Sequence, residues 1–209
     1  MKILVTGHKG FIGQHLTKYL SEKTDHELVT YDWQDEPNKL DFDYESLDWI
    51  IHLGAISSTN ESNIKKITQQ NIDYTIALFD NAVKHNVHFQ FASSAALYGK
   101  NDAHQKFSED STPLDPRSPY AWSKYIAEHY MTSLRKPDNI HVQCFRYFNV
   151  YGPEHEDHKL GQASPLYTFN KQKEELGRIT LFLGSDEFKR DFIHVSKVCQ
   201  THLKLLSIP

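Results

Sequence analysis

The chain has 209 residues, which is enough for one large domain with a buried core, or for one domain with a small lobe. Its formal net charge of −4 at pH 7 excludes the basic field that favours nucleic-acid binding. Because no apolar run approaches the ~20 residues of a membrane span, and the apolar start is too short for a signal sequence, we expect a soluble cytoplasmic protein.

Strand-like and helix-like segments alternate along most of the chain. Runs of β-branched and other apolar residues predict strands at 2–6, 27–32, 48–55, 88–93 and 140–147. Apolar side chains at helical spacing predict helices at 11–21, 62–86 and 119–134. This alternation is typical of an α/β fold with a doubly wound parallel sheet covered on both faces. Ligands of such sheets lie at the carboxyl ends of the strands.

Two parts of the chain depart from this alternation. Residues 33–47 are acidic and too few for a full crossover helix. After residue 152, loops are mixed with a predicted helix at 163–176, a strand at 179–183 and a helix at 194–206. We therefore expect a nucleotide-binding domain over 1–152. Over 153–209 we expect the start of a substrate-binding lobe, incomplete, with segments that return to the first domain.

The two cysteines, Cys144 and Cys199, are far apart in sequence and lack the spacing of metal ligands. They predict two reduced thiols, as in a cytosolic protein, and no metal site.

Three glycines at three-residue spacing follow the first strand and open the first helix: Gly7, Gly10 and Gly13. In that context the spacing predicts a Rossmann-type dinucleotide site, the alternative being a plain strand–helix turn. We expect Gly7 to permit the sharp turn, Gly10 to let the backbone approach a pyrophosphate, and Gly13 to let the helix pack closely on the sheet. The amides of the first helical turn, which includes Phe11 and Ile12, then face the phosphates.

An acidic residue, Asp32, ends the second predicted strand, 19 residues after Gly13. A carboxylate at this place can accept hydrogen bonds from the ribose hydroxyls of NAD. NADP would place a phosphate there and would call for a nearby cation, but Trp33 and acidic residues follow and the first base is Lys39. The sequence therefore favours NAD and leaves NADP as the alternative.

A serine, a tyrosine and a lysine form the candidate catalytic set. Ser94 ends the fourth predicted strand, and Tyr120 and Lys124 lie four residues apart, on one face of a predicted helix. A phenol is a poor base at neutral pH. A lysine ammonium one turn away and the positive nicotinamide ring would stabilise its phenolate. Ser94 would orient the same substrate oxygen, and Lys124 would also hold the nicotinamide ribose.

Several motifs in this order resemble those of the extended short-chain dehydrogenase/reductase family, in its nucleotide-sugar epimerase/dehydratase group. They are "TGHKGFIG" (6–13), "HLGA" (52–55), "SSAALYG" (93–99), "YAWSK" (120–124) and "RYFNVYGP" (146–153). Three further stretches, 54–61, 145–164 and 181–195, are similar to the ADP-heptose 6-epimerases of that group.

The resemblance implies roles for further residues. It implies that Gly54 and Ala55 line the cofactor, with Asn71 close by, and that Val150 faces the nicotinamide. Lys159 matches a second catalytic residue, on the opposite side of the sugar from Tyr120. The expected cofactor-binding set is Gly7, Gly10, Phe11, Ile12, Gly13, Asp32, Trp33, Leu53, Gly54, Ala55, Asn71, Tyr120, Lys124 and Val150. The expected substrate-binding set is Ser57, Ser94, Asn149, Lys159, Phe182, Gly184, Ser185 and Arg190.

The chain also departs from the ADP-heptose 6-epimerase pattern. Leu160 and Gly161 stand where that pattern has a glycine–serine pair, and Thr168 replaces a substrate-side histidine. The family enzymes that it resembles favour NADP, whereas the residues after Asp32 suit NAD. Arg190 is a suitable bidentate diphosphate clamp, with an ion pair to Asp191 or another acid as its alternative.

The implied reaction is epimerisation of a nucleoside-diphosphate sugar in surface-polysaccharide or lipopolysaccharide synthesis. Inverting an unactivated carbinol carbon requires transient removal of hydride, because its C–H bond is not acidic. The hydride returns to the other face, so the cofactor undergoes no net change. We expect Tyr120 to take the hydroxyl proton, and Lys159 or Tyr120 to assist the reduction.

Three alternatives stay open. A 4,6-dehydratase would carry an acid pair after the catalytic serine strand, which "SSAALYG" lacks. A one-way reductase or dehydrogenase is the second alternative. A non-catalytic NAD-binding module, either a fragment or a naturally short protein, is the third. We also expect a homo-oligomer, because the helices at 62–86 and 119–134 carry apolar residues on more than one face, although these could equally pack on the sheet.

Overall fold

The computed structural model describes residues 1–99, 108–109, 112–156, 163–187 and 189–207. Five parallel strands form its main sheet, in the order β2-β1-β3-β4-β5. They are β1 (Lys2–Thr6), β2 (Glu27–Tyr31), β3 (Trp49–His52), β4 (His88–Ser94) and β5 (Val142–Tyr147). Each lies within one or a few residues of a predicted strand, which confirms the α/β fold with a parallel, doubly wound sheet.

The strand order places a topological switch point between β1 and β3. A classical dinucleotide-binding sheet has one more strand beyond β2. Here residues 33–47 contain only the short 3-10 helix η1 (Tyr44–Ser46), so the chain returns from β2 directly to β3. The expectation that this crossover is too short for a full helix is confirmed. Ligands of open parallel sheets bind outside the carboxyl ends of the strands at such a point.

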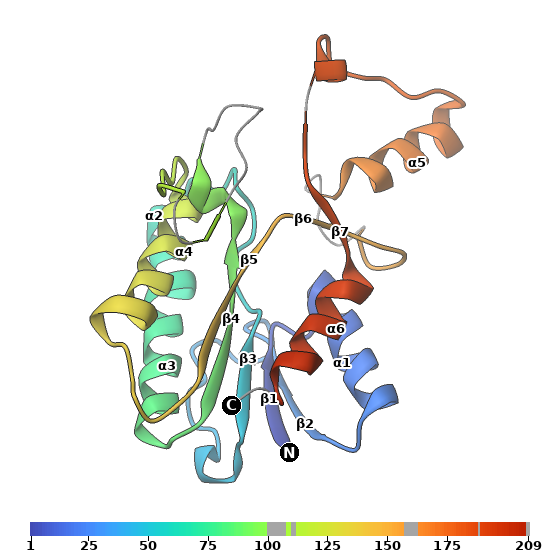
Figure 1. Cartoon of the computed structure of the whole chain (residues 1–209). Coiled ribbons are helices and arrows are strands. Elements are labelled where there is room, and N and C mark those ends of the chain that lie inside the picture. The colour runs from blue at the N-terminus through green and yellow to red at the C-terminus, as the bar shows by residue number, and fades with distance from the viewer. Residues whose placement is uncertain (100–107, 110–111, 157–162, 188, 208–209) are drawn as a thin grey trace.

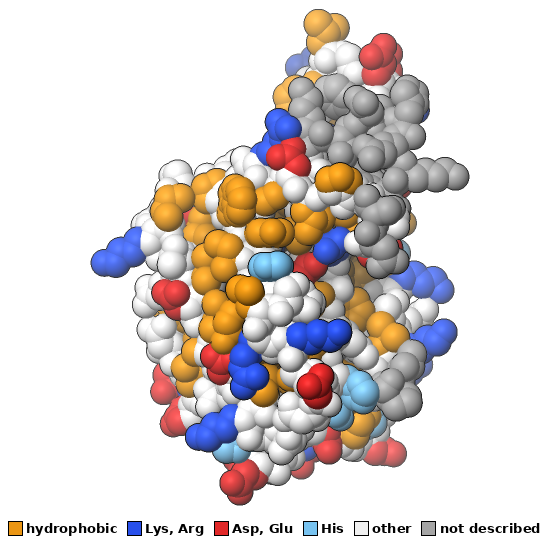
Figure 2. All heavy atoms as spheres, turned by 60° about the vertical axis from the view of Figure 1, so that its left-hand side comes forward, with side chains coloured by type: hydrophobic (Ala, Val, Ile, Leu, Met, Phe, Trp, Pro, Cys, Tyr) orange, Lys and Arg blue, Asp and Glu red, His pale blue; other side chains and the backbone are white. Residues whose placement is uncertain are grey.

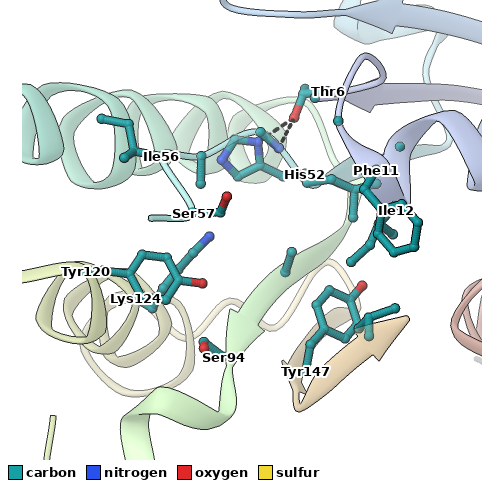
Figure 3. Close-up of a pocket in the computed structure, with 18 of the residues that line it drawn as sticks. Thr6, Phe11, Ile12, His52, Ile56, Ser57, Ser94, Tyr120, Lys124 and Tyr147 are labelled. Atoms are coloured by element: carbon teal, nitrogen blue, oxygen red, sulfur yellow. Dashed lines mark hydrogen bonds between the residues drawn. The ribbon is translucent and has the colours of Figure 1, made fainter. Parts of the chain in front are cut away.

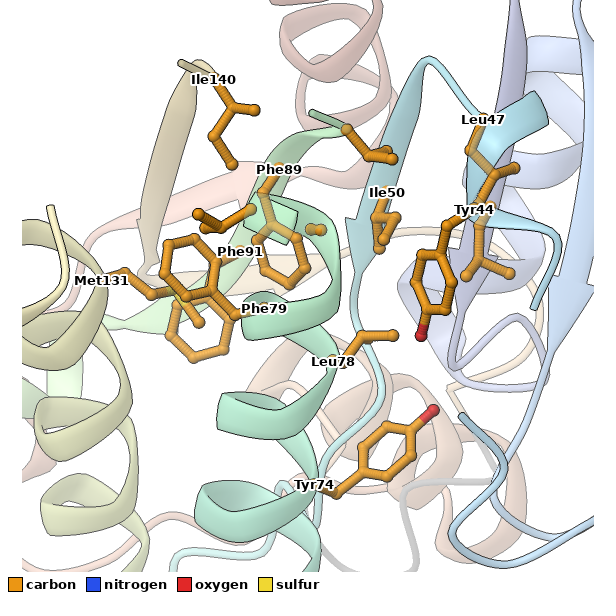
Figure 4. Close-up of a cluster of buried hydrophobic side chains, with 14 of the residues drawn as sticks. Tyr44, Leu47, Ile50, Tyr74, Leu78, Phe79, Phe89, Phe91, Met131 and Ile140 are labelled. Carbon is orange, nitrogen blue, oxygen red and sulfur yellow. The ribbon is translucent and has the colours of Figure 1, made fainter. Parts of the chain in front are cut away.

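Helices cover both faces of the sheet (Figure 1). One face carries α1 (Phe11–Lys23) and α6 (Val195–Leu205), which contact each other. The other carries α3 (Tyr74–Lys84) and α4 (Pro119–His129). Because alternate strand residues point to opposite faces, Leu4 and Ile50 join the cluster under α3 and α4, whereas Ile3 and Ile51 join the cluster with α1 and α6. Figure 4 shows the first cluster.

The two long predicted helices each contain a π-helical segment. Residues 62–86 fold as α2 (Ile64–Ile67), the π segment η2 (Thr68–Asp73) and α3. Helix α4 begins after Ser118, whose side chain accepts from the amide of Ala121, and continues into the π segment η4 (Tyr130–Leu134). Extra residues of this kind change which side chains face the sheet, and the apolar periodicity did not indicate them.

The last third of the chain leaves the sheet and returns to it. A second, two-stranded sheet pairs β6 (Asn149–Tyr151) with β7 (Phe192–His194) in parallel. Between them lie α5 (Pro165–Leu176) and the short 3-10 helix η6 (Ser185–Glu187), and a further one, η3 (Ala95–Tyr98), follows β4. The predicted helices at 163–176 and 194–206 are confirmed as α5 and α6. The predicted strand at 179–183 is wrong, because these residues are irregular and exposed and have no strand beside them.

No helix in the described part of the chain is both long enough and apolar enough to cross a bilayer. Cys144 and Cys199 carry free thiols, and the described residues include no group of three or more potential metal ligands.

Candidate active site

A cavity of about 690 Å³ opens at the carboxyl ends of all five strands of the main sheet. The glycine turn after β1 and Asp32 after β2 line one part of it, and Ser94, Tyr120 and Lys124 line another. Figure 3 shows the side chains of Tyr120, Lys124 and Ser94 turned toward the same space. The fold thus brings together both sets of residues that the sequence singled out separately.

The glycine turn is shaped for close backbone approach. Gly7 has a φ of 74°, in the left-handed region that glycine adopts without strain, and its amide donates to the carbonyl of Tyr31 at 2.8 Å. A Cβ on Gly13 would lie 2.1 Å from the carbonyl oxygen of Gly7. Helix α1 begins after Gly10, where no side chain caps its first turn. This turn faces the cavity and suits a diphosphate, which backbone amides and the helix dipole would stabilise.

Asp32 directly follows β2, next to the glycine turn, and is buried. Its Oδ1 accepts from the amide of Gln34 at 3.1 Å, and its Oδ2 accepts from the amide of Lys9 at 3.4 Å. Both contacts fix the carboxylate where it lines the cavity. The side chain of Lys9 pairs with the carboxylate of Asp35. The backbone of Lys9 therefore contacts Asp32, while its ammonium pairs with Asp35 three residues further on; among the residues that follow Asp32 in the sequence, the first base is Lys39.

Asn71 lies outside the lining of the cavity and supports the segments that form it. Its Oδ1 accepts from the amide of Ile56 at 2.8 Å, and its Nδ2 donates to the carbonyl of Ile56 at 3.0 Å and to Ser123 Oγ at 3.0 Å. Ser123 Oγ in turn donates to the carbonyl of Tyr120 at 2.7 Å. Asn71 is buried and does not line the cavity. It ties the loop after β3 to the helix that carries the tyrosine and lysine.

Burial dominates the electrostatics of the tyrosine–lysine pair. Tyr120 and Lys124 are both buried, and the Lys124 ammonium lies 4.7 Å from the centroid of the Phe91 ring. Burial lowers the pKa of Lys124 to about 7. Burial also raises the pKa of Tyr120, and a hydrogen bond with Ser94 opposes this rise only in part. The sequence led us to expect that Lys124 would lower the tyrosine pKa, but in the protein alone desolvation raises it, and the opposing contribution comes from Ser94.

A buried histidine on β3 supports the floor of the cavity. His52 Nδ1 lies 2.6 Å from Thr6 Oγ1, and its Nε2 lies 2.9 Å from Thr75 Oγ1. Burial and, secondarily, the charge of Lys124 lower the pKa of His52 to about 3, so the ring is neutral. His52 was not among the predicted site residues. A polar residue at the end of the apolar run "WII" (49–51) was the available signal.

The expected substrate residues divide into two groups. Ser57, Ser94 and Asn149 line the cavity, and so do the expected cofactor residues Trp33, Leu53, Gly54, Ala55 and Val150. Phe182, Gly184, Ser185 and Arg190 do not line it. Phe182 is 84% exposed, and the Arg190 guanidinium donates to the carbonyl of Lys189 at 2.8 Å. Lys159 lies outside the described residues.

Some cavity residues were not predicted. They include the side chains of Lys66, Gln70, Tyr147 and Ser164. Ser164 is held by the buried Glu156, whose carboxylate accepts from the Ser164 amide at 2.7 Å and from its hydroxyl at 2.9 Å. Nothing in the local sequence indicated this pair, since the two residues are eight positions apart in the chain.

Comparison with known proteins places this geometry in a family. The model of the NAD dependent epimerase/dehydratase family matches residues 3–209. A UDP-N-acetylglucosamine 4-epimerase from Methanobrevibacter ruminantium, solved with UDP-N-acetylmuramic acid, is 28% identical with a TM-score of 0.82, over 97% of this chain and 71% of that one. A UDP-glucose 4-epimerase from Thermotoga maritima, solved with UDP-glucose, is 26% identical with a TM-score of 0.82, over 99% and 74%.

An ADP-L-glycero-D-manno-heptose-6-epimerase from Helicobacter pylori has the same fold, with a TM-score of 0.81 and 23% identity over 98% of this chain and 73% of that one. The motifs seen in the sequence, the cavity at the switch point and the match over residues 3–209 agree with one another. This protein belongs to the NAD dependent epimerase/dehydratase family.

Proposed function

We propose that the protein is a nucleotide-sugar epimerase that inverts a carbinol carbon by removing and returning a hydride. The observation that carries the proposal is the convergence of Ser94, Tyr120 and Lys124 on the same cavity as the glycine turn and Asp32. A protein that only binds a dinucleotide needs the turn and the carboxylate. It has no need of a buried tyrosine and lysine at the other end.

The residues present fit NAD. The uncapped first turn of α1 and the close approach of Gly7 and Gly13 leave room for a diphosphate, and a Cβ at either glycine would meet backbone. The Asp32 carboxylate suits ribose hydroxyls. When bound, NAD supplies a hydride acceptor that becomes the donor in the second half of the reaction.

The chain's own residues move the proton and hold the sugar. Tyr120 takes the proton of the substrate hydroxyl, and its phenolate is favoured once a positive nicotinamide ring lies near it, which offsets the cost of burial. Ser94 hydrogen-bonds the same oxygen and orients it. Lys124 holds the ribose next to the nicotinamide. Lys159 or Tyr120 protonates the oxygen when the carbonyl is reduced on its other face.

The sugar is a nucleoside-diphosphate hexose or heptose. The stretches around residues 54–61, 145–164 and 181–195 favour an ADP-heptose, whereas two solved relatives above 25% identity contain UDP-N-acetylmuramic acid and UDP-glucose. Arg190 and the residues from Phe182 to Ser185 would reach the sugar nucleotide only if their segment moves toward the cavity. Surface-polysaccharide synthesis in the cytoplasm is the process in which such a product would be used.

The test follows the sugar by proton NMR. Purified protein is incubated in D₂O with NAD and, in turn, ADP-heptose, UDP-glucose and UDP-N-acetylglucosamine. We expect inversion of one carbon without exchange of its hydrogen for deuterium, because the same hydride returns. Tyr120→Phe should lower the rate by about 10²–10⁴-fold, whereas Tyr125→Phe, on the same helix but outside the cavity lining, should not change it.

Other outcomes would contradict the proposal. Inversion that survives Tyr120→Phe would refute the role of the tyrosine. Loss of water from the sugar would indicate a dehydratase, and NADH formed in proportion to product would indicate a one-way dehydrogenase. Binding of NAD without conversion of any sugar nucleotide would favour the non-catalytic module.

A further inference from the structure

A buried ion pair joins the catalytic helix to the edge strand of the main sheet. Arg146 on β5 donates to Glu128 Oε1 on α4 through Nε at 2.9 Å and through Nη2 at 2.5 Å. Both side chains are largely buried. The second carboxylate oxygen of Glu128 accepts a hydrogen bond from the hydroxyl of Ser93 on β4. One carboxylate therefore links three separate elements.

Each of these elements carries part of the candidate active site. Ser93 immediately precedes Ser94. Glu128 follows Lys124 by one helical turn, on the same side of α4. Arg146 lies next to Tyr147, which lines the cavity, and its Nη1 donates at 3.1 Å to the hydroxyl of Tyr98 on η3, the segment that follows Ser94.

A buried ion pair is an expensive way to hold a fold together. The desolvation of two charges offsets most of their attraction, and well-packed apolar side chains of similar size are often as stabilising. The pair lies where three functional segments must keep a fixed spacing, and small displacements there lower the rate of a positioned reaction steeply. We propose that Glu128 and Arg146 are positioning residues, which hold the segments of Ser94, Tyr120 and Lys124 in register and keep the Glu128 charge neutralised.

The charge of the Glu128 carboxylate influences the titratable groups that lie near it. The titratable or charged groups around Glu128 are Arg146 and Cys144 on β5, Tyr98 on η3 and Lys124 on its own helix. Glu109 and Asp191 also line a second cavity, separate from the candidate active site, which Glu128 and Arg146 line too. Burial and, after it, the Glu128 charge raise the pKa of Cys144 to about 12. Without Arg146, a bare carboxylate would stand one turn from Lys124 and favour its charged form.

The inference is tested in two ways: a kinetic test, which rests on the proposed function, and an NMR titration, which does not. Proteins labelled with ¹³C at lysine Cε are titrated by NMR without cofactor, the Lys124 signal being assigned with Lys124→Met. Arg146→Gln should raise the pKa of Lys124 by ~0.5 unit or more, and Glu128→Gln should lower it, because each leaves the opposite charge unpaired. The double variant should return the pKa to the wild-type value.

Kinetics separate positioning from charge. The double variant should keep a kcat about tenfold below wild type, with an unchanged KM, since the link between the segments remains cut. Arg146→Lys, which keeps a positive charge beside Glu128, should have a kcat between that of the double variant and that of wild type. Arg135→Gln, whose guanidinium lies 3.9 Å from Asp80 at the surface, should change neither readout.

Two results would overturn the inference: a Lys124 pKa that is the same in wild type and both single variants, or a double variant with wild-type kcat. If Arg146→Gln does not fold, Glu128→Gln still tests the sign of the shift. If wild type converts no sugar nucleotide, the proposed function fails while the NMR titration still decides the electrostatic part.

Discussion

Gly7 approaches Gly54 so closely that a Cβ on Gly7 would lie 2.5 Å from the Gly54 amide nitrogen. Gly7 directly follows β1 and Gly54 lies two residues after the end of β3, the strands on either side of the switch point. Their contact fixes the floor of the cavity, because neither backbone can retreat without breaking its strand pairing.

Gly7→Ala should therefore weaken NAD binding by at least about tenfold and destabilise the fold by more than the ~1 kcal/mol of a positive φ alone. Gly177→Ala is the matched control, since Gly177 has a φ of 66° but nothing within 4 Å of the added Cβ. Fluorescence titration with NAD and thermal unfolding measure the two effects. Equal effects of both substitutions would mean that the contact with Gly54 has no role.

The stability of the cofactor-free protein should rise with pH through the charge of Lys124. Its pKa is about 7 in the folded protein and ordinarily 10.5, so between these values the unfolded chain binds more protons than the folded one. Stability from this group therefore grows by up to ~1.4 kcal/mol per pH unit over that range. Lys124→Met should lack this increase. Urea unfolding of both proteins at pH 6.5, 8 and 9.5 tests it, and parallel pH dependences would refute it.

The choice between NAD and NADP should depend on the pairing of Lys9 with Asp35. That ion pair neutralises the ammonium of a lysine whose backbone amide donates to Asp32. Asp35→Asn should free the cation for a 2′-phosphate and lower the ratio of the NADP and NAD dissociation constants by about tenfold. Asp41→Asn, which removes a contact with Lys39 at 3.6 Å, is the control. An unchanged ratio would show that Lys9 does not reach the ribose.

The outer face of α2 and α4 should form a contact between copies of the chain. Its exposed apolar side chains include Ile64, Trp122 and Ile126, and Figure 2 shows hydrophobic side chains gathered on this side of the molecule. Light scattering should find a homo-oligomer, and Trp122→Glu combined with Ile126→Glu should give a monomer with unchanged helicity. Leu176→Glu, an exposed position on α5, should not. A monomeric wild type would refute the prediction.

The sequence predicts those elements whose side chains repeat with a clear period. Strand β1 alternates residues between two cores and helix α4 begins at a serine cap with proline, so both are visible locally. The sequence pattern does not indicate β6 and β7, which have three residues each and form only because they pair with each other across 43 positions. It places a strand at 179–183, where apolar residues have no neighbouring strand to pair with.

The residues of the candidate site likewise divide into those that the sequence indicates and those that it does not. Gly7, Asp32, Ser94 and Tyr120 stand at strand ends or in a helix, so the fold class alone brings them together. Their supporting partners come from elsewhere in the chain. The role of Asn71 depends on a π-helical turn, and Arg146 meets Glu128 only after β5 has paired with β4.

The pairing of β6 with β7 forms a seam that closes one excursion of the chain away from the main sheet. Residues 152–191 leave at the end of β6 and rejoin at the start of β7, and Asn149 fastens the seam by donating to the carbonyl of Asp191 through its amide at 3.2 Å and its side chain at 2.8 Å. The end of β6, where the excursion leaves, and the start of β7, where it returns, are separated by the length of one short strand, ~10 Å. Insertions or deletions within this excursion therefore leave the register of the main sheet untouched. A nucleotide-binding scaffold built in this way tolerates inserts of different size between one pair of short strands.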